Sequence, residues 1–268
     1  MKYSIIIPFY SHPIDEIISI AEKIGDCEVV AIVTGNIELI QSSNILRKIE
    51  CHKCGYGEAV NKGVQYSTGD YLIIMNDDVS FNSSFFEILN KMDFDVIVPT
   101  VYDYKTNEIE STHSSLDFLW YNRLKKNLPN RNKAHIPGSI FIIKRGLFDK
   151  SGGFDEDYFM YYEDIDLSLR VEKISVPFFS KDLKVCHKHS FSNFNEKRYY
   201  LQRNRILFIV KNCRKIYLPF FFIYLFTIEM FVMIYQLIKS GETYPLFARI
   251  DFLKNALKFI RKRYAHNN

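Results

Sequence analysis

Cysteine is scarce in this chain, and its pattern argues against a disulfide framework. The 268 residues include five cysteines, an odd number, and Met1–Pro8 is too short for the apolar core of a secretory signal peptide. Small secreted proteins held together by disulfides carry paired cysteines behind such a signal. We therefore expect a reducing, cytosolic location.

A complete set of zinc ligands is also missing. Cys51 and Cys54 have the Cys-x-x-Cys spacing of half a zinc site, but the chain has no second motif of this kind. Cys186, His187 and His189 form the only possible complement. Structural zinc is therefore a minor alternative.

The chain also lacks a strong excess of positive charge. Its net charge of +4 over 268 residues argues against a nucleic-acid partner. Aromatic residues, in contrast, are plentiful: the 23 Phe and 18 Tyr concentrate in the last third of the chain, together with much of the basic charge. The length suits one catalytic domain with an appendage.

Apolar runs and amphipathic stretches alternate along the first two thirds of the chain. We predict strands at Tyr3–Phe9, Glu28–Val33, Tyr71–Met75, Asp95–Val101, Ser139–Lys144 and Val176–Cys186, and helices at Pro13–Ile24, Ile37–Lys48 and Tyr56–Tyr66. This alternation predicts an α/β fold with a mixed, mostly parallel sheet flanked by helices. The polar stretch Tyr102–Ala134 interrupts it and is a candidate loop over an active site.

The most acidic segment, residues 152–170, combines a glycine turn with the start of a helix. Helical spacing begins at about Glu163, so that Glu163, Asp164 and Asp166 fall in the first turn. The helix dipole stabilises anions there, and Asp166 can pair with Arg170 one turn later. Capping explains part of this acid, and Glu163 and Asp164 at the helix entrance can face a cleft.

A second acidic cluster, Asn76-Asp77-Asp78, follows the predicted strand Tyr71–Met75. Ligands of open α/β sheets bind at the carboxyl ends of the strands. Adjacent carboxylates at that edge suit a hard divalent cation that bridges to phosphate oxygens. A solvated turn that caps the next helix through Ser83 or Ser84 is an equal alternative on spacing alone.

Six short motifs follow one another in a fixed order. They are Pro8-Phe-Tyr10, Gly55-Tyr-Gly-Glu-Ala-Val-Asn61-Lys-Gly63, Met75-Asn-Asp-Asp-Val79, Pro137-Gly138-Ser139, Gly152-Gly-Phe-Asp-Glu156 and Glu163-Asp-Ile-Asp-Leu167. In this combination the chain resembles family 2 glycosyltransferases, in particular the rhamnosyltransferase-like branch that builds bacterial surface polysaccharides. The resemblance runs from about residue 2 to residue 212.

The resemblance implies a GT-A fold, a nucleotide-sugar donor, Mg²⁺ or Mn²⁺, and single displacement with inversion at the anomeric carbon. It implies Asp164 as general base with Glu163 beside it, a role that contributes about 10²–10⁴ in rate. Bound metal would neutralise the departing diphosphate as a Lewis acid. The implied metal ligands are Asp78 and His187, with His189 as the fallback.

Further residues are assigned to the two substrates by the same resemblance. The donor nucleotide or its diphosphate is expected at Pro8, Tyr10, Asn36, Asn61, Asp77 and Arg203, and the acceptor at Gly153, Asp155 and Glu156. Many relatives place an Asp soon after the second strand to read the base, where this chain has Thr34-Gly35-Asn36. Asn36 can still hydrogen-bond uracil or thymine, so the identity of the nucleotide base in the donor stays open.

Ordinary structural roles compete with several of these assignments. His187 can be a hydrogen-bonded structural histidine. Tyr10 can be a core residue at the end of a strand. Arg203 can pair with Glu196 on the surface.

Two other functions share parts of this pattern. A sugar nucleotidyltransferase would need a basic, glycine-rich loop after the first strand, and Phe9-Tyr-Ser-His12 is not such a loop. A non-catalytic scaffold with a degenerate transferase fold would lose the acids, whereas Asp78 and Asp164 both persist.

The last sixty residues point to a membrane. Tyr217–Ile238 is long enough to cross a bilayer, which takes about 20 residues, but Glu229 near its middle opposes insertion by about 2.5–3.5 kcal/mol. Basic residues flank both ends, so a re-entrant or in-plane helix fits better than an oriented span.

The tail after this segment has the pattern of a basic amphipathic helix. Its apolar face comprises Ile250, Leu253, Leu257, Ile260 and Tyr264, and its charges are Lys254, Lys258, Arg261, Lys262 and Arg263. Such helices bind anionic lipid surfaces, although packing on the protein itself is an alternative.

These patterns divide the chain into two functional parts. We expect a catalytic domain at residues 1–212 and membrane-associating helices at 213–268. The protein would then lie on the cytoplasmic side of the cell membrane and act on a glycan or lipid-linked glycan acceptor.

Overall fold

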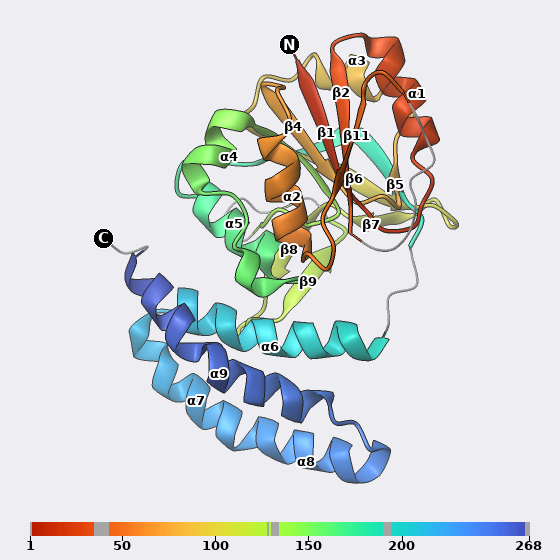
Figure 1. Cartoon of the computed structure of the whole chain (residues 1–268). Coiled ribbons are helices and arrows are strands. Elements are labelled where there is room, and N and C mark those ends of the chain that lie inside the picture. The colour runs from red at the N-terminus through yellow and green to blue at the C-terminus, as the bar shows by residue number, and fades with distance from the viewer. Residues whose placement is uncertain (1, 35–42, 128, 130–133, 190–193, 266–268) are drawn as a thin grey trace. The chain divides into compact units, whose positions relative to one another are not determined.

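The computed structural model describes residues 2–34, 43–127, 129, 134–189 and 194–265. The chain divides into two compact units, Met1–Ser190 and Phe191–Asn268 (Figure 1). The helix α6 (Phe194–Asn212) thus belongs to the second unit, although it lies before the functional boundary expected at residue 212. The division into a catalytic and a membrane-associating part stays a prediction.

The first unit is built on a mixed sheet with the strand order β3-β2-β1-β4-β10-β6-β11-β5, and β7 pairs with β6. Strands β1 to β4, β6 and β11 run in one direction, and β5, β7 and β10 run in the other. The bounds are β1 (Tyr3–Phe9), β2 (Cys27–Val33), β3 (Leu46–Glu50), β4 (Tyr71–Met75), β5 (Val79–Ser80), β6 (Val96–Asp103), β7 (Ile109–Ser111), β10 (Ile140–Lys144) and β11 (Phe178–His187). The expected mixed, mostly parallel sheet is confirmed.

Helices cover both faces of this sheet (Figure 1). They are α1 (Asp15–Ile24), α2 (Tyr56–Gln65), α3 (Phe85–Leu89), α4 (Arg145–Ser151), the 3₁₀ turn η1 (Glu156–Tyr158) and α5 (Glu163–Val171). Side chains of a strand alternate between faces, so Ile5 and Ile7 of β1 join one hydrophobic cluster with α1 and α3, and Ile6 joins another with α2, α4 and α5. Two cores therefore hold the sheet rigid beneath its carboxyl edge.

The helix predicted at Ile37–Lys48 is wrong where the structure describes it. Leu46–Glu50 forms β3, which pairs in parallel with β2, and the predicted residues 37–42 lie outside the described residues. The edge of β2 offers unpaired backbone groups, and satisfying them outweighs the local helical spacing.

The polar stretch Tyr102–Ala134 has more structure than a loop. It contains the end of β6, the strand β7 and a hairpin of β8 (His113–Leu116) and β9 (Asn122–Lys125). Short strands with few apolar residues give weak periodicity, so the sequence did not reveal them. The consequence for the site is that β7 brings a further acid to the sheet edge.

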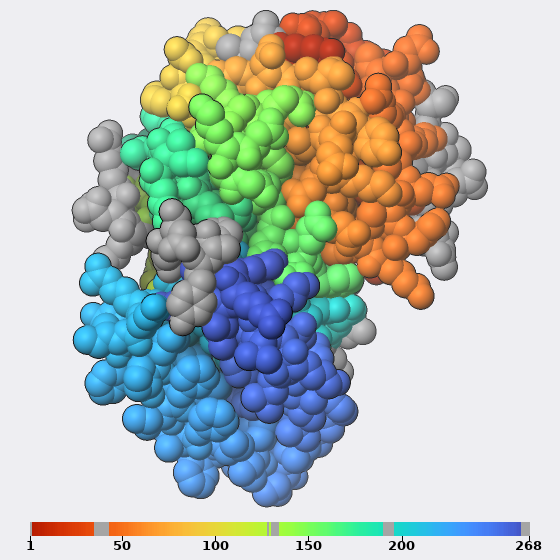
Figure 2. Space-filling model, turned by 60° about the vertical axis from the view of Figure 1, so that its left-hand side comes forward, coloured from red at the N-terminus to blue at the C-terminus, as the bar shows by residue number. Residues whose placement is uncertain are grey.

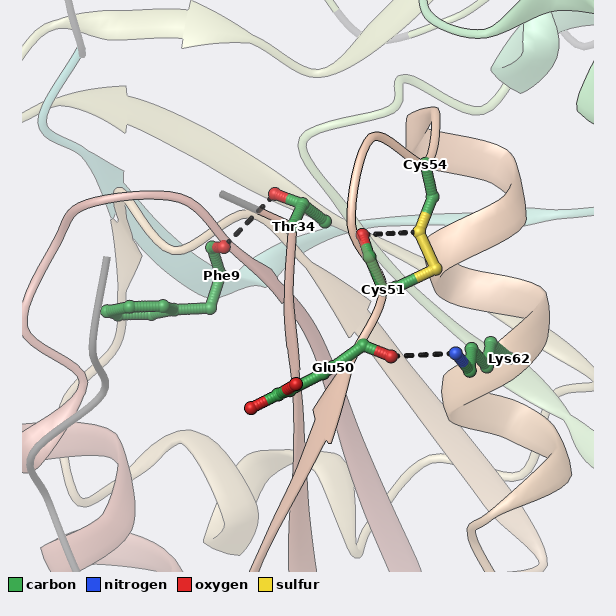
Figure 3. Close-up of a disulfide and its surroundings, with 6 residues drawn as sticks. All are labelled: Phe9, Thr34, Glu50, Cys51, Cys54 and Lys62. Carbon is green, nitrogen blue, oxygen red and sulfur yellow. Dashed lines mark hydrogen bonds between the residues drawn. A yellow bond between two sulfur atoms is a disulfide. The ribbon is translucent and has the colours of Figure 1, made fainter. Parts of the chain in front are cut away.

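The carboxyl ends of the first three strands are tied together (Figure 3). The hydroxyl of Thr34 donates to the Phe9 carbonyl over 3.2 Å, and Lys62 Nζ donates to the Glu50 carbonyl over 2.7 Å. Between β3 and α2, the sulfur atoms of Cys51 and Cys54 are joined in a disulfide. The two thiolates that a zinc site requires are thus bonded to each other, so the zinc alternative is not supported.

This disulfide was not predicted, because the cysteine count had favoured free thiols. It is a local bridge between residues separated by three positions, and not a framework that joins distant elements. Among the described residues, Cys27, Cys186 and Cys213 are free.

The second unit is entirely helical in its described part. It contains α6, a short 3₁₀ turn (Lys215–Tyr217), α7 (Leu218–Phe226), α8 (Ile228–Ser240) and α9 (Tyr244–Ala265). The segment Lys215–Ser240 has a mean hydropathy of 1.9 and is long and apolar enough to cross a membrane, which by itself is weak support for a span. Thr227, at φ −109° and ψ −86°, separates α7 from α8.

Glu229, which had counted against insertion, is buried in an ion cluster. Its carboxylate pairs with Arg205 of α6 and lies 3.3 Å from Arg249 Nη2 of α9. Each of the three charges therefore has an opposite partner within the unit. The helix α8 is fastened to α6 and α9 at this point.

The apolar stripe predicted on α9 is not the face that packs. Ala248, Phe252 and Phe259 are buried, whereas Leu253 and Leu257 of the predicted stripe are 66% and 70% exposed. Tyr264 is not among the residues whose side chains are described. Other exposed apolar side chains lie on α7 and α8, and they include Phe220, Ile223, Phe226, Phe231 and Ile238. These two helices form part of the broad blue surface in Figure 2.

Candidate active site

The Asn76-Asp77-Asp78 turn follows β4 at the carboxyl edge of the sheet, as expected. The Asp77 carboxylate accepts hydrogen bonds from the backbone N–H groups of Tyr10, Ser11 and His12, at 2.8, 2.7 and 3.0 Å. Asp77 thus fixes the loop after β1. The Tyr10 side chain is 65% exposed, so the alternative that it is a core residue is excluded.

Asp78 is buried and lies beside His187, the last residue of β11. The Oδ2 atom of Asp78 is 3.2 Å from Nε2 of His187. This contact follows from strand pairing, because His187 lies opposite Val79 in the β5–β11 ladder. The sequence had associated the two residues only through the resemblance.

The other ring nitrogen of His187 contacts an acid that the sequence analysis missed. Nδ1 lies 3.0 Å from Oε2 of Glu110, which is on β7. Burial lowers the pKa of His187, but hydrogen bonds and charges of Asp78 and Glu110 outweigh it and raise that pKa to about 9. In the sequence, the only indication of Glu110 was a short alternation of apolar and polar residues within the polar stretch Tyr102–Ala134.

Asp78 and His187 fit a divalent cation. A carboxylate oxygen and an imidazole nitrogen are ligands that Mn²⁺ accepts, and Mg²⁺ prefers the oxygen. Two neighbouring ligands on an octahedral ion with bonds of about 2.0–2.1 Å are about 3 Å apart. The observed 3.2 Å between Asp78 Oδ2 and His187 Nε2 agrees with that spacing.

The other acidic cluster, Glu163 and Asp164, lies at the start of α5, and its two acids have different surroundings. Glu163 is 6% exposed, and its Oε2 atom has no hydrogen-bond partner among the described residues. Asp164 is half-buried, and its carboxylate accepts hydrogen bonds from the backbone N–H groups of Ile165 and Gly138. Asp166 pairs with Arg170 over 3.1 Å, as predicted.

These surroundings give the two carboxyls different acidities. Burial and the adjacent Asp164 charge raise the pKa of Glu163 well above its usual range. Burial raises the pKa of Asp164 to about 6, although its backbone hydrogen bonds oppose the rise. Glu163 is therefore harder to ionise than an ordinary glutamate, while Asp164 can still ionise and accept a proton near neutral pH.

One loop, Pro137-Gly138-Ser139, joins the two clusters. On one side the Asn76 N–H donates to the Ser139 carbonyl over 3.0 Å. On the other side Gly138 lies against Asp164, where a Cβ atom would be 3.0 Å from Oδ2 of Asp164. The acids that were far apart in the sequence therefore share one short segment.

Tyr56, the first residue of α2, reinforces this junction. Its hydroxyl donates to the Gly138 carbonyl over 2.9 Å. Burial raises the Tyr56 pKa well above 10, and charges on Glu163, Asp164 and Asp78 add to that effect. All three acids thus act on the same phenol.

Asn61 contacts the glycine turn at residues 152–156. Its amide exchanges two hydrogen bonds of 2.9 Å with the backbone of Phe154 and donates a third of 2.9 Å to Glu156. Gly153 has φ +64°, and a Cβ there would lie 2.8 Å from Asn61 Oδ1, so only glycine fits. Asp155 caps η1 by accepting from the Asp157 N–H over 3.2 Å.

The remaining predicted donor residues are less informative. Pro8 lies in β1 near its carboxyl end. Asn36 lies outside the described residues. Arg203 is in the second unit, where its Nε donates to Asn204 over 2.9 Å and Nη1 lies 3.8 Å from Asp251.

Comparison with curated proteins finds partial relatives. Over 38 residues the chain is 50% identical to an N-acetylglucosaminyl-diphospho-decaprenol L-rhamnosyltransferase of Mycobacterium tuberculosis, a match that covers 14% of this chain and 12% of the relative. Over 136 residues it is 22% identical to the low-salt glycan biosynthesis hexosyltransferase Agl10 of Haloferax volcanii, which covers 46% of this chain and 44% of the relative. The matches thus span less than half of either relative.

Solved structures share the fold at low identity. The structure of S. aureus TarS residues 1–349 in complex with UDP-GlcNAc is similar with a TM-score of 0.56 and 13% identity, covering 80% of this chain and 68% of that one. The mannosyltransferase PcManGT from Pyrobaculum calidifontis, in complex with GDP-Man and Mn²⁺, has a TM-score of 0.53 and 12% identity, covering 98% and 84%. The expected GT-A fold is confirmed.

The sequence model of glycosyl transferase family 2 matches residues 4–152, which is more than half of the chain. That range contains the first strand, the Asn76-Asp77-Asp78 turn and the Gly138 loop. The chain belongs to glycosyl transferase family 2.

Proposed function

We propose that the protein is an inverting, metal-dependent glycosyltransferase that moves a hexose, such as rhamnose, from a dTDP- or UDP-sugar to a glycan acceptor. The observation that carries this proposal is the Gly138 loop, which joins a metal-suited pair, Asp78 and His187, to an ionised carboxylate at Asp164. Rhamnosyl transfer is the activity of a partial relative, and UDP-GlcNAc is bound by a protein of similar fold.

Asp78 and His187 would hold the cation, which when bound neutralises charge on the departing diphosphate. Tyr10, exposed on the loop fixed by Asp77, would pack on the nucleotide base. Asn36 and Arg203 stay candidates for the base and the diphosphate. Asn61 would act on the donor indirectly, through the turn that it holds.

Asp164 would be the general base. The acceptor oxygen attacks the anomeric carbon, the bond from that carbon to the diphosphate oxygen breaks, and the hydroxyl proton passes to Asp164. Attack opposite the leaving group inverts the anomeric carbon. Glu163, whose pKa burial and the Asp164 charge raise, would resist placing a second negative charge beside the nucleophile.

The acceptor would lie against Gly153, Asp155 and Glu156, and we propose that it is lipid-linked. The exposed apolar side chains of α7, α8 and α9 support this, because a surface of that kind suits a membrane at which such an acceptor is found. The protein would then act on the cytoplasmic side of the cell membrane, where nucleotide-sugars are made.

The test is transfer and hydrolysis assayed over a panel of dTDP-, UDP- and GDP-sugars with Mn²⁺ or Mg²⁺. Asp78→Ala is expected to abolish turnover, and Asp164→Asn to lower kcat by about 10²–10⁴. Asp70→Ala, an exposed acid at the other end of β4, is the matched control and should leave turnover unchanged. Full turnover by Asp78→Ala or Asp164→Asn would remove that residue from the mechanism.

A further inference from the structure

The His187 ring is held at both of its nitrogens. Nε2 lies 3.2 Å from Asp78, and Nδ1 lies 3.1 and 3.0 Å from the two carboxylate oxygens of Glu110. The Glu110 side chain is 17% exposed. An imidazole with an acid at each end has little freedom to rotate.

Four strands, β5, β6, β7 and β11, bring these residues together. In the β6–β11 ladder His187 lies opposite Asp103, and in the β6–β7 ladder Ile109, next to Glu110, lies opposite Tyr102. The β5–β11 ladder sets His187 opposite Val79, which follows Asp78. Backbone pairing on rigid strands therefore fixes the positions from which all three side chains extend.

The chemistry of Glu110 determines which ring nitrogen carries hydrogen. An ionised carboxylate only accepts hydrogen bonds, so Nδ1 of His187 must be the donor. By the same rule Nε2 donates to Asp78 in the absence of a cation; a bound cation would take the place of that Nε2 proton, while Glu110 keeps the hydrogen on Nδ1. A carboxylate behind a histidine commonly orients a metal-binding ring in this way.

The second imidazole at this edge has a different orientation. Nε2 of His189 is 3.4 Å from Glu110 and 3.2 Å from Asp103, and the side chain is 48% exposed. His189 thus faces Asp103 and Glu110, and Glu110 contacts both rings. His187 is the ring that faces Asp78.

We propose that Glu110 is a positioning residue for the metal site, holding His187 so that its Nε2 atom faces Asp78 and the bound divalent cation. This inference rests on the proposed function. Loss of a carboxylate in this position typically weakens metal binding by about 10–100-fold. The conservative amide should retain most of the binding, because its oxygen still accepts from Nδ1.

The test measures Mn²⁺ binding directly, by electron paramagnetic resonance of free Mn²⁺ titrated into the full chain with UDP or dTDP. Glu110→Ala should raise the Kd for Mn²⁺ by about 10–100-fold, and Glu110→Gln should restore most of that loss. Glu108→Ala, which removes an exposed acid two residues away, is the matched control and should change nothing. His187→Ala gives the value for loss of the ring.

Activity provides the second measurement. Turnover by Glu110→Ala should recover at saturating Mn²⁺, which a merely misfolded protein would not do. An unchanged Kd in Glu110→Ala, or turnover that Mn²⁺ cannot restore, would overturn the positioning role. If the wild type itself binds neither Mn²⁺ nor nucleotide, the proposed function fails instead.

Discussion

Asp164 and Glu163 are adjacent in the chain, yet the structure gives their carboxyl groups different surroundings. Glu163 is enclosed and its pKa is raised furthest, while Asp164 reaches the Gly138 loop and accepts backbone hydrogen bonds. Sequence spacing could not separate them, because both fall in the first turn of α5. The difference arises in part from Gly138 and Ile165, whose backbone N–H groups donate hydrogen bonds to the Asp164 carboxylate.

The pH dependence of the reaction should therefore have its acidic limb at about pH 6. Below that value Asp164, whose folded pKa is about 6, becomes protonated and cannot accept a proton, so kcat/KM should fall about tenfold per pH unit. Glu163→Gln should keep this limb, because the limb comes from protonation of Asp164. A limb that disappears in Glu163→Gln and persists in Asp164→Asn would identify Glu163 as the base.

Other residues at this scale show what sequence can and cannot reveal. Asp78, Asp164 and Gly138 were found from motifs, and the structure brings them to one edge. Glu110 was missed because its role depends on pairing between β6 and β7, which are joined by a turn with no distinctive pattern. Asn61 was assigned to the donor, but its contacts are with the turn at Phe154.

At the scale of elements, long periodic segments were predicted well, and the strand β3 at the edge of the sheet was not. The strand at Tyr71–Met75 and the helices at Asp15–Ile24 and Tyr56–Gln65 match closely, because burial and periodicity agree there. The strand at Leu46–Glu50 was not predicted, because it is pairing with β2 that makes this segment a strand. On α9 two apolar stripes compete, and periodicity alone does not say which one packs.

The ion cluster at Glu229 should be a stability determinant of the helical unit. Glu229→Ala leaves Arg205 and Arg249 without this shared acid in a buried setting, and removing one partner of a buried pair costs about 3–5 kcal/mol. Glu242→Ala, which removes a partly exposed partner of Arg198, should cost at most about 1 kcal/mol. Denaturant unfolding in mild detergent, followed by circular dichroism, measures both.

Equal losses in the two variants would show that the Glu229 cluster is solvated in solution.

The expected difference has a further meaning for α8. A helix that is tied by charge to α6 and α9 cannot cross a bilayer alone without breaking those pairs. The cluster therefore favours the in-plane arrangement expected from the sequence.

At the scale of the whole molecule, the chain couples a unit built on the mixed sheet to a helical unit rich in exposed apolar side chains. Full-length protein should bind vesicles of anionic phosphatidylglycerol more tightly than vesicles of phosphatidylcholine, and less tightly at high salt. Replacing the exposed Lys254, Lys258 and Arg261 with Ala should weaken binding by about 3 kcal/mol, or on the order of 100-fold. Vesicle co-sedimentation measures this.

The matched control replaces three exposed lysines of the first unit, Lys23, Lys91 and Lys150, with Ala. The control should bind as the wild type does. Similar losses in both triple variants would mean that overall charge, and not α9, governs attachment. No binding by the wild type would contradict a membrane role for α7 to α9.

The Gly138 loop also has a consequence for how such a protein can vary. In the proposed mechanism, the distance between the departing diphosphate and the incoming hydroxyl would depend on three consecutive residues, Pro137-Gly138-Ser139, since Ser139 holds the Asn76 turn and Gly138 abuts Asp164. Side chains elsewhere on α5, or on β4 before the Asn76 turn, can be substituted as long as the three-residue length of this loop is kept. An insertion or deletion in these three residues would move the two halves of the reaction apart, so chain length here is under tighter constraint than composition elsewhere in the site.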